Sequence, residues 1–280
     1  MDLIYEKILE YKKRGVPIYL VSAVEKEGMG PVEVGKKMIV TDSGESFGTV
    51  GGGSLEHYAI NKAKSLFLTR KPLLEKYGLN EDKIIPGVLT LPMVCGGIVT
   101  LFYEYLGAKA DIFIFGGGHV GQALINVLKT MDFHVEVIDE RKAICDNVKN
   151  ADQVHNMPFL DYIDTYGIQE SSYIVVCTPS HKYDYHVINK ILSIKAKPKY
   201  IGMLCSPSKL DDYLDKTYET FGQDVNLKNF YAPIGLDTGG GTVEEIAISI
   251  TGEILSIYYG KEDHSHMREK NHGKYRYWED

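Results

Sequence analysis

Three glycine clusters in this chain stand directly before segments with a helical pattern. They are Gly51-Gly52-Gly53, Gly116-Gly117-Gly118 and Gly239-Gly240-Gly241. The N-terminus of a helix offers backbone N–H groups without partners and the positive end of the helix dipole, so each cluster could hold an anion. Tight turns and close packing also require glycine and are the alternative for any single cluster. Three clusters in one chain favour a ligand that carries phosphate.

The second cluster belongs to a G-x-G-x-x-G motif that follows the apolar segment 111–115. In this motif Gly116 allows the tight turn between strand and helix, and Gly118 lets the backbone approach a diphosphate. Gly121 lets the helix pack closely on the strand. We therefore expect a phosphate or diphosphate at the start of this helix.

The next apolar segment, 134–139, ends at Asp139, which stands 18 residues after Gly121. A carboxylate that binds a ribose hydroxyl is expected at this point of a nucleotide-binding unit, and Arg141 would suit a 2′-phosphate. A solvated charge pair between Asp139 and Arg141 is the alternative. Strand, loop, helix, second strand and terminal acid in this order predict a nucleotide-type fold.

Cys95 has the sequence surroundings of a reactive thiol. It follows an apolar segment and precedes Gly96 and Gly97, which leave the sulfur accessible and offer N–H groups to a thiolate. A buried structural cysteine is the alternative, and we expect that state for Cys145 and Cys177.

Cys205 and Glu56 are two further candidates. Cys205 follows the apolar segment 199–204, at the rim where ligands gather in open α/β sheets. Glu56 and His57 lie in the first turn of the helix after Gly53 and could form an acid–base pair. For Glu56, a carboxylate that merely favours the positive end of the helix dipole is the alternative.

The first part of the chain combines helical and extended patterns. Leu55, Ala59 and Ala63 recur at helical spacing, which places Ser54 at the N-cap position of that helix. Alternation and turn residues predict strands at 17–25, 37–41, 87–94 and 98–106. A mixed α/β domain is therefore expected over residues 1–107.

A link of small residues, 107–110, precedes a regular alternation of strands and helices, which is typical of a parallel sheet. The strands are predicted at 111–115, 134–139, 173–177 and 199–204, and the last helix begins at the capping box Thr242-Val-Glu-Glu245. The predicted fold class is α/β, with the N-terminal mixed α/β domain followed by a Rossmann-like parallel-sheet domain over 108–262 and a polar tail over 263–280.

Composition limits the classes of partner. The 280 residues suffice for two domains, and 44% of them are hydrophobic. No apolar run reaches the roughly 20 residues that span a bilayer, and the N-terminal segment lacks the features of an export signal, so we expect a soluble cytoplasmic protein without a membrane partner. A net charge of −7 argues against nucleic acid. The four cysteines are scattered, so free thiols are expected.

The motifs resemble those of the XdhC/CoxI family, the accessory factors of xanthine and carbon monoxide dehydrogenases. The similar segments lie in both domains and are Gly48-Thr-Val-Gly-Gly-Gly-Ser-Leu-Glu56, Cys95-Gly-Gly97, Phe115-Gly-Gly-Gly-His-Val-Gly121 and Pro233-Ile-Gly-Leu-Asp-Thr-Gly-Gly-Gly-Thr-Val-Glu-Glu-Ile246. The resemblance implies a homodimeric maturation factor, rather than an enzyme, that binds molybdenum cofactor (molybdopterin). It also implies two protein partners: a cysteine desulfurase in cofactor sulfuration, and a xanthine-dehydrogenase-type molybdenum hydroxylase that receives the cofactor.

The resemblance and the glycine neighbours also suggest residue roles. Cys95 is expected to carry the sulfur or metal chemistry, while Glu56 and Asp237 are expected to line a cleft between the domains and orient the pterin edge. The residues expected to bind the cofactor are Gly51, Gly52, Gly53, Gly96, Gly97, Gly116, Gly118, His119, Gly121, Asp139, Asp237, Gly239 and Gly240.

The chain departs from the family pattern at two places. Ser54 stands where the family usually has cysteine, so this motif lacks the second thiol, and segment 27–35 lacks an arginine that would contact phosphate. Two other functions are compatible with the glycine loop and Asp139: an NAD(P)-dependent oxidoreductase and a nucleotide-sensing regulatory module. Bound pterin and molybdenum would favour the maturation factor, and hydride turnover would favour the oxidoreductase.

Overall fold

A computed structural model describes residues 2–30, 32–81, 85–93 and 96–261. The chain forms two compact units that divide between Lys109 and Ala110. The sequence placed this division two residues earlier, after residue 107. The predicted tail over 263–280 lies outside the described residues, as does Cys95.

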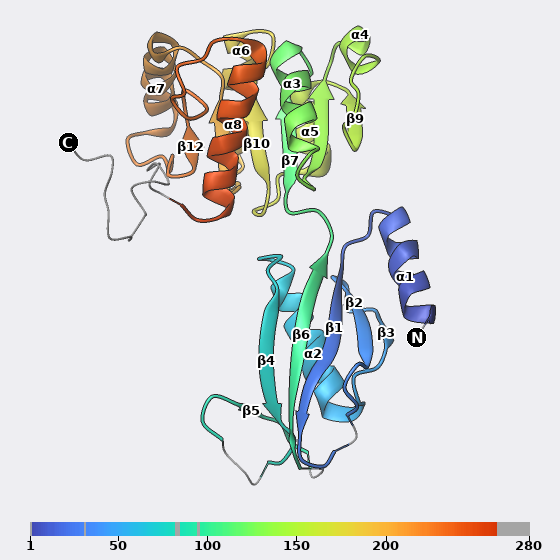
Figure 1. Ribbon diagram of the computed structural model, residues 1–280. Helices are drawn as coiled ribbons and strands as arrows, with labels where there is room; N and C mark the ends of the chain where they lie inside the picture. The colour runs from blue at the N-terminus through green and yellow to red at the C-terminus, as the bar shows by residue number, and fades with distance from the viewer. Residues whose placement is uncertain (1, 31, 82–84, 94–95, 262–280) are drawn as a thin grey trace, which may run out of the picture. The chain divides into compact units, whose positions relative to one another are not determined.

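The first unit contains one six-stranded sheet with the order β3-β2-β1-β6-β4-β5 (Figure 1). Among the described strand pairs of this sheet, only β4–β5 is parallel. The elements are α1 Asp2–Lys13, β1 Ile18–Glu27, β2 Lys37–Thr41, β3 Ser46–Gly48, α2 Gly53–Leu66, β4 Leu73–Gly78, β5 Leu89–Thr90 and β6 Ile98–Leu106.

The alternating side chains of β1 build a separate core on each face of this sheet. Tyr19 and Val21 belong to the larger core, against which α2 packs with the buried Leu55, Ala59 and Ala63. Those three residues lie one turn apart, so a single stripe of α2 faces the sheet. The intervening strand residues Ile18 and Leu20 pack on the other face against Tyr11 of α1.

The second unit contains a six-stranded sheet in which every pair is parallel, with the order β12-β11-β10-β7-β8-β9. This is the strand order of the doubly wound dinucleotide-binding fold, so the predicted fold class is confirmed. The elements are β7 Asp111–Phe115, α3 His119–Leu128, β8 His134–Asp139, α4 Lys142–Cys145, β9 Gln153–Asn156, α5 Phe159–Tyr166, β10 Tyr173–Val176, α6 His181–Ser193, β11 Tyr200–Met203, α7 Pro207–Phe221, β12 Phe230–Tyr231 and α8 Val243–Tyr258.

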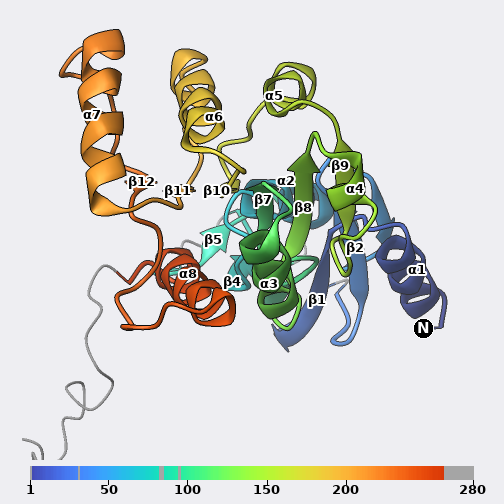
Figure 2. The same cartoon turned by 90° about the horizontal axis from the view of Figure 1, so that it is seen from above.

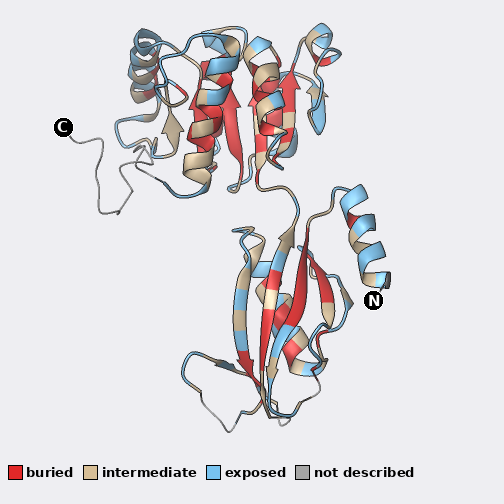
Figure 3. Ribbon diagram, in the orientation of Figure 1, coloured by how far each residue is buried: buried red, intermediate tan, exposed pale blue. Residues whose placement is uncertain are grey.

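Helices cover both faces of the parallel sheet. Figure 2 shows α3 and α8 on one face and α5, α6 and α7 on the other. The central strands β7, β8, β10 and β11 are buried along most of their length (Figure 3), and a separate hydrophobic core forms on each face. Burial on both faces explains the apolar run of β10, in which all four residues are buried.

Three predictions about elements need correction. Only Leu89–Thr90 of the strand predicted at 87–94 is described as extended, and Pro92 within that stretch has no N–H group to donate to a sheet. Ser54 is not the N-cap of α2, because the helix begins at Gly53 and Gly52 occupies the cap. The strands β4, β9 and β12 were not predicted.

The capping box at the start of α8 is confirmed, with Thr242 at the N-cap and reciprocal bonds to Glu245. Among the described residues, no helix has both the length and the hydropathy needed to cross a membrane.

Candidate functional site

The glycine loop of the second unit lies at the point where the strand order of the parallel sheet reverses. β7 pairs with β8 on one side and with β10 on the other. The chain leaves β7 through Gly116–Gly118 and enters α3 at His119, which is exposed. Ligands of open α/β sheets bind in the crevice at such a reversal, so this loop is the candidate site of the unit.

Two glycines of the G-x-G-x-x-G motif, one in the loop and one in α3, are required by packing. A Cβ atom on Gly116 would lie 2.3 Å from the carbonyl oxygen of Cys177, and Gly116 has a φ of +119°. A Cβ atom on Gly121 would lie 2.2 Å from the carbonyl oxygen of Gly116. Both distances are far below contact, so β7, α3 and β10 approach one another only because these side chains are absent.

Gly118 has no such neighbour among the described residues. A Cβ atom there would meet no atom within 4 Å, and the φ of −68° suits any residue. Within the described part of the chain, no side chain caps the N-terminus of α3. The loop therefore leaves open space beside unpaired N–H groups, an arrangement that can accept a phosphate group.

Asp139 is enclosed beneath the same loop and is 0% exposed. Its Oδ2 accepts hydrogen bonds from the Gly117 N–H at 2.9 Å and from Arg141 Nη2 at 2.6 Å. Its Oδ1 accepts from the Arg141 N–H and Nε, both at 2.9 Å. Burial would raise the pKa of Asp139, but the bonds from Arg141 and Gly117 outweigh it and hold the pKa below its usual value.

Four donors saturate this carboxylate, which has about four acceptor positions. A ribose hydroxyl could bind Asp139 only by displacing Arg141 or Gly117. In the observed arrangement Asp139 positions the glycine loop, and Arg141 folds back onto it rather than forming a solvated pair.

A carboxylate also occupies the glycine cluster of the first unit. Oε1 of Glu56 accepts hydrogen bonds from the Thr49 hydroxyl, from the Val50 N–H at 3.2 Å and from the Gly52 N–H at 2.8 Å. His57 contacts Asn61 one turn later, at 3.1 Å between Nε2 and Nδ2. Glu56 thus stabilises the loop before α2, and its negative charge opposes an anion at these N–H groups.

The remaining glycines of this cluster differ in what surrounds them. A Cβ atom on Gly51 would lie 2.7 Å from Val32, whereas Gly52 and Gly53 face open space and have positive φ values of 80° and 61°. Gly51 is therefore required by packing, and the other two by backbone conformation.

The third cluster has a carboxylate partner as well. Oε2 of Glu245 accepts hydrogen bonds from the Gly241 N–H at 3.0 Å and from the Thr242 N–H at 2.9 Å. These bonds lower the pKa of Glu245. A Cβ atom on Gly240 would lie 2.7 Å from Glu245 Cβ, so that glycine is needed for the capping box. Asp237 and Gly239 are exposed on the connection between β12 and α8.

The expectation that Glu56 and Asp237 line one cleft and orient the pterin edge involves residues of both units and stays a prediction. Cys95 also stays a prediction, but its glycine neighbours are described. The Gly96 N–H donates to the Leu79 carbonyl oxygen at 2.9 Å, and a Cβ atom on Gly97 would lie 2.5 Å from the Met29 carbonyl oxygen. The backbone after Cys95 is therefore fixed by close packing.

The other cysteines are thiols in protected surroundings. Cys145 and Cys177 are buried, as expected, and donate to the carbonyl oxygens of Asp139 and Gly116. Burial raises the pKa of Cys177 to about 12. Cys205 is half-buried, and burial together with the nearby charge of Asp184 raises its pKa. None of these three is a stabilised thiolate.

The loop after β10 leads into the start of α6. Thr178 donates to Oδ1 of Asp184 from its N–H at 2.9 Å and from its hydroxyl at 2.6 Å. Asp184 is only 6% exposed, and burial raises its pKa to about 6. The described residues contain no group of metal-ligating side chains that could hold an ion.

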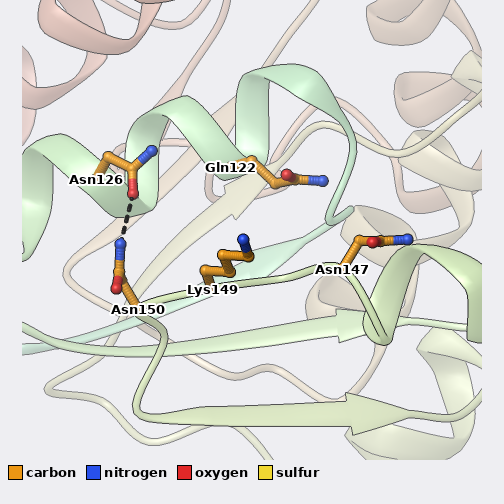
Figure 4. A pocket seen from close by; sticks show the side chains of 5 residues that line it. All are labelled: Gln122, Asn126, Asn147, Lys149 and Asn150. Carbon is orange, nitrogen blue, oxygen red and sulfur yellow. Dashed lines mark hydrogen bonds between the residues drawn. The ribbon is translucent and has the colours of Figure 1, made fainter.

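Sequence reasoning missed a polar pocket between α3 and the connection from α4 to β9. Its volume is about 360 Å³, and its lining residues are Gln122, Asn126, Asn147, Lys149 and Asn150 (Figure 4). Gln122 lies directly after the glycine motif and donates from Nε2 to the Gly117 carbonyl oxygen at 3.0 Å. The spacing of Gln122 and Asn126, one turn apart on a helix whose other residues after His119 are apolar, was the signal available in the sequence.

Residues 112–254 match the family model described as the XdhC Rossmann domain, which is more than half of the chain. The chain belongs to the XdhC family. Residues 12–78 match the model of the XdhC and CoxI family, so the membership covers parts of both units. The family expected from the glycine and capping motifs is thereby confirmed.

Two curated proteins illustrate the relationship within the XdhC family. The chain is 23% identical over 257 residues to the uncharacterized protein YqeB of Escherichia coli K12, which covers 91% of this chain and 46% of that protein. It is 27% identical over 157 residues to a probable xanthine dehydrogenase subunit of Bacillus subtilis 168, covering 55% of this chain and 45% of that protein. The chain thus spans about half the length of the curated relatives it matches.

A solved structure shows the same fold. A xanthine dehydrogenase from Bacillus halodurans superimposes with a TM-score of 0.51 at 18% identity, covering 93% of this chain and 97% of that chain. At this identity the similarity establishes the arrangement of elements and nothing about activity.

Proposed function

We propose that this chain is an accessory factor of a xanthine-dehydrogenase-type molybdenum hydroxylase, and that it binds molybdenum cofactor as cargo and assists its sulfuration and insertion. The observation that carries the proposal is the XdhC family membership in both units. The Bacillus subtilis relative is named as a probable xanthine dehydrogenase subunit, and this name supports the choice of partner. A cysteine desulfurase as sulfur donor and a homodimeric assembly are part of the same proposal.

The residues at the start of α3 fit the phosphate of such a cargo. Gly118 faces open space, and no described side chain caps the helix. The glycine clusters at 51–53 and 239–241 fit less well, because Glu56 and Glu245 already accept their N–H groups. The phosphate is therefore assigned to the N–H groups after Gly118, with His119 exposed beside them.

When bound, the cofactor supplies the molybdenum and pterin chemistry, while this chain binds, orients and shields it. Asp139 keeps the loop in place through the Gly117 N–H. Cys95 is the proposed sulfur-handling residue, since Cys145 and Cys177 are buried and the burial of Cys205 favours its protonated thiol.

The proposal is tested by cofactor content and by activation of the partner. Chain purified from its native source is assayed for molybdenum by mass spectrometry and for pterin by fluorescence after oxidation. Cys95→Ala should abolish activation of the hydroxylase, and Cys205→Ala is the matched control that should retain it. An active Cys95→Ala protein with full cofactor content would refute the role of this thiol.

Gly118→Val tests the phosphate position separately. A branched side chain would fill the open space over the loop, so cofactor retention should fall at least tenfold while the fold persists. Unchanged retention would place the phosphate elsewhere.

A dinucleotide-sensing module is the second candidate, because the strand order is that of dinucleotide-binding folds. The saturated carboxylate of Asp139 counts against a ribose at the usual position. Titration with NAD(H) and NADP(H) by calorimetry distinguishes this candidate, and an NAD(P)-dependent oxidoreductase would in addition show hydride turnover.

A further inference from the structure

The polar pocket of the second unit has a composition that selects one kind of ligand. Four of its five lining residues have carboxamide side chains, and the fifth, Lys149, has a positively charged side chain. Figure 4 shows Lys149 between the Asn126–Asn150 pair on one side and Gln122 and Asn147 on the other. The volume of about 360 Å³ lies in the range of small-molecule sites.

Hydrogen bonds fix the direction of the carboxamides. The amide nitrogens of Gln122 and Asn147 donate to backbone carbonyl oxygens, those of Gly117 at 3.0 Å and Ala143 at 2.7 Å. The amide nitrogen of Asn150 donates to Oδ1 of Asn126 at 3.0 Å.

These bonds leave the amide oxygens of Gln122, Asn147 and Asn150 without a donor among the described residues. Lys149 likewise has no acceptor there, and the amide nitrogen of Asn126 is also unused. The pocket thus offers three amide oxygens as acceptors and, as donors, the ammonium group, the Asn126 NH₂ group and the second N–H of the other three amides.

A matching ligand has several N–H donors beside a carbonyl acceptor and carries no positive charge. We propose that the pocket binds the 2-amino-4-oxo edge that guanine and pterin share. The ring N–H and the exocyclic amine donate to the carboxamide oxygens, and the ring carbonyl accepts from Lys149. The inference rests on the proposed function, since the pterin of that cargo has this edge, and it deepens that function by naming the ring subsite.

The pocket adjoins the phosphate position. Gln122 lines the pocket and holds the carbonyl of Gly117, the residue before the N-cap Gly118. Asn126 follows one turn later, about 6 Å further along the helix axis. A ligand whose phosphate lies at the start of α3 can therefore place its ring beside the first two turns of the same helix.

The test measures binding of pterin, guanosine and lumazine to the full chain by fluorescence quenching or calorimetry. Lumazine has a carbonyl in place of the 2-amino group, so it should bind at least tenfold more weakly than pterin. Tighter binding of pterin than guanosine would identify the cofactor as the source of the edge, and the reverse would identify a guanine nucleotide; both support the subsite. The proposed subsite would be overturned if lumazine bound as tightly as pterin, or if neither pterin nor guanosine bound.

Variants place the ring in this pocket. Asn147→Ala and Lys149→Met each remove one hydrogen-bonding group at an exposed position and should each raise the Kd for pterin by about tenfold, as expected for one lost hydrogen bond. Lys228→Met, at an exposed lysine beyond α7, is the matched control and should leave the Kd unchanged. If neither pocket variant weakens binding, the ring lies elsewhere.

Failure of the inference and failure of the proposed function give different results. The subsite alone is refuted if the wild-type chain retains cofactor and activates the hydroxylase while the pocket variants still bind pterin normally. Wild-type chain that binds pterin but neither retains cofactor nor activates the hydroxylase refutes the proposed function.

Discussion

Asp184 is a buried carboxyl group in the first turn of α6 whose pKa of about 6 lies above the usual value because of burial. A raised pKa means that the folded state prefers the protonated form. The contribution of Asp184 to stability is therefore greatest at low pH, and this contribution is lost as the pH rises from about 4 through 6. At neutral pH the ionised group costs on the order of 3 kcal/mol.

Asp184→Asn should remove this cost. Both Thr178 donors bind Oδ1, which an asparagine retains, so the change removes the charge without losing the bonds. We expect the free energy of unfolding at pH 8 to rise by about 1 to 3 kcal/mol, with a flatter dependence between pH 4 and 7. Urea unfolding across that range measures both quantities, and identical pH profiles for the two proteins would contradict the assignment.

The glycine motif and Asp139 show what the sequence could and could not predict at the level of single residues. The spacing of Gly116, Gly118 and Gly121 predicted the loop and the helix start, because the backbone requirements of that turn are local. The bonds to Asp139 could not be predicted, since they depend on Arg141 folding back and on the Gly117 N–H pointing toward the strand end. The sequence located Asp139 correctly but could not show that its carboxylate is saturated.

At the scale of elements, the G-x-G-x-x-G motif that joins β7 to α3 combines two different uses of glycine. Gly121→Ala would place a Cβ atom 2.2 Å from the Gly116 carbonyl oxygen, whereas Gly118→Ala would meet no described atom within 4 Å. We expect Gly121→Ala to lower the free energy of unfolding by about 2 kcal/mol or more, and Gly118→Ala to change it by less than about 1 kcal/mol. Thermal and urea unfolding of the matched pair measure this, and equal losses would show that the loop has another conformation.

Elements with a strong local pattern were predicted at their observed bounds. The strand at 98–106 and those at 111–115 and 134–139 were found as predicted, since apolar side chains fill most of their buried positions. β9 was missed because an edge strand needs few apolar residues, and three of its four positions are exposed. Pairing with β8 makes it a strand, and such pairing is not encoded within its four residues.

At the scale of the whole molecule, each unit completes its own sheet and its own core. Every strand of the parallel sheet pairs with another strand of the second unit, and both of its cores are formed by residues after Lys109. The division into two domains was predictable because the regular strand–helix alternation begins only at residue 111. The polar pocket was not, because its two walls come from segments that are about 20 residues apart and meet only in the fold.

The independence of the two cores predicts how the chain unfolds. A fragment that spans residues 110–261 should fold alone, with the near-ultraviolet circular dichroism expected for the fully buried Tyr200 and Tyr213 and a cooperative urea transition.

In the full chain, Gly121→Ala should shift only the transition that this fragment shows and leave that of residues 1–109 in place, because the substitution acts inside one core. Tyrosine fluorescence and circular dichroism of the fragment and of both full-length proteins follow the two transitions. A fragment with helical signal but no near-ultraviolet signal would show that the second unit needs the first for its packing, and a single shared shift in the full chain would show that the units unfold as one.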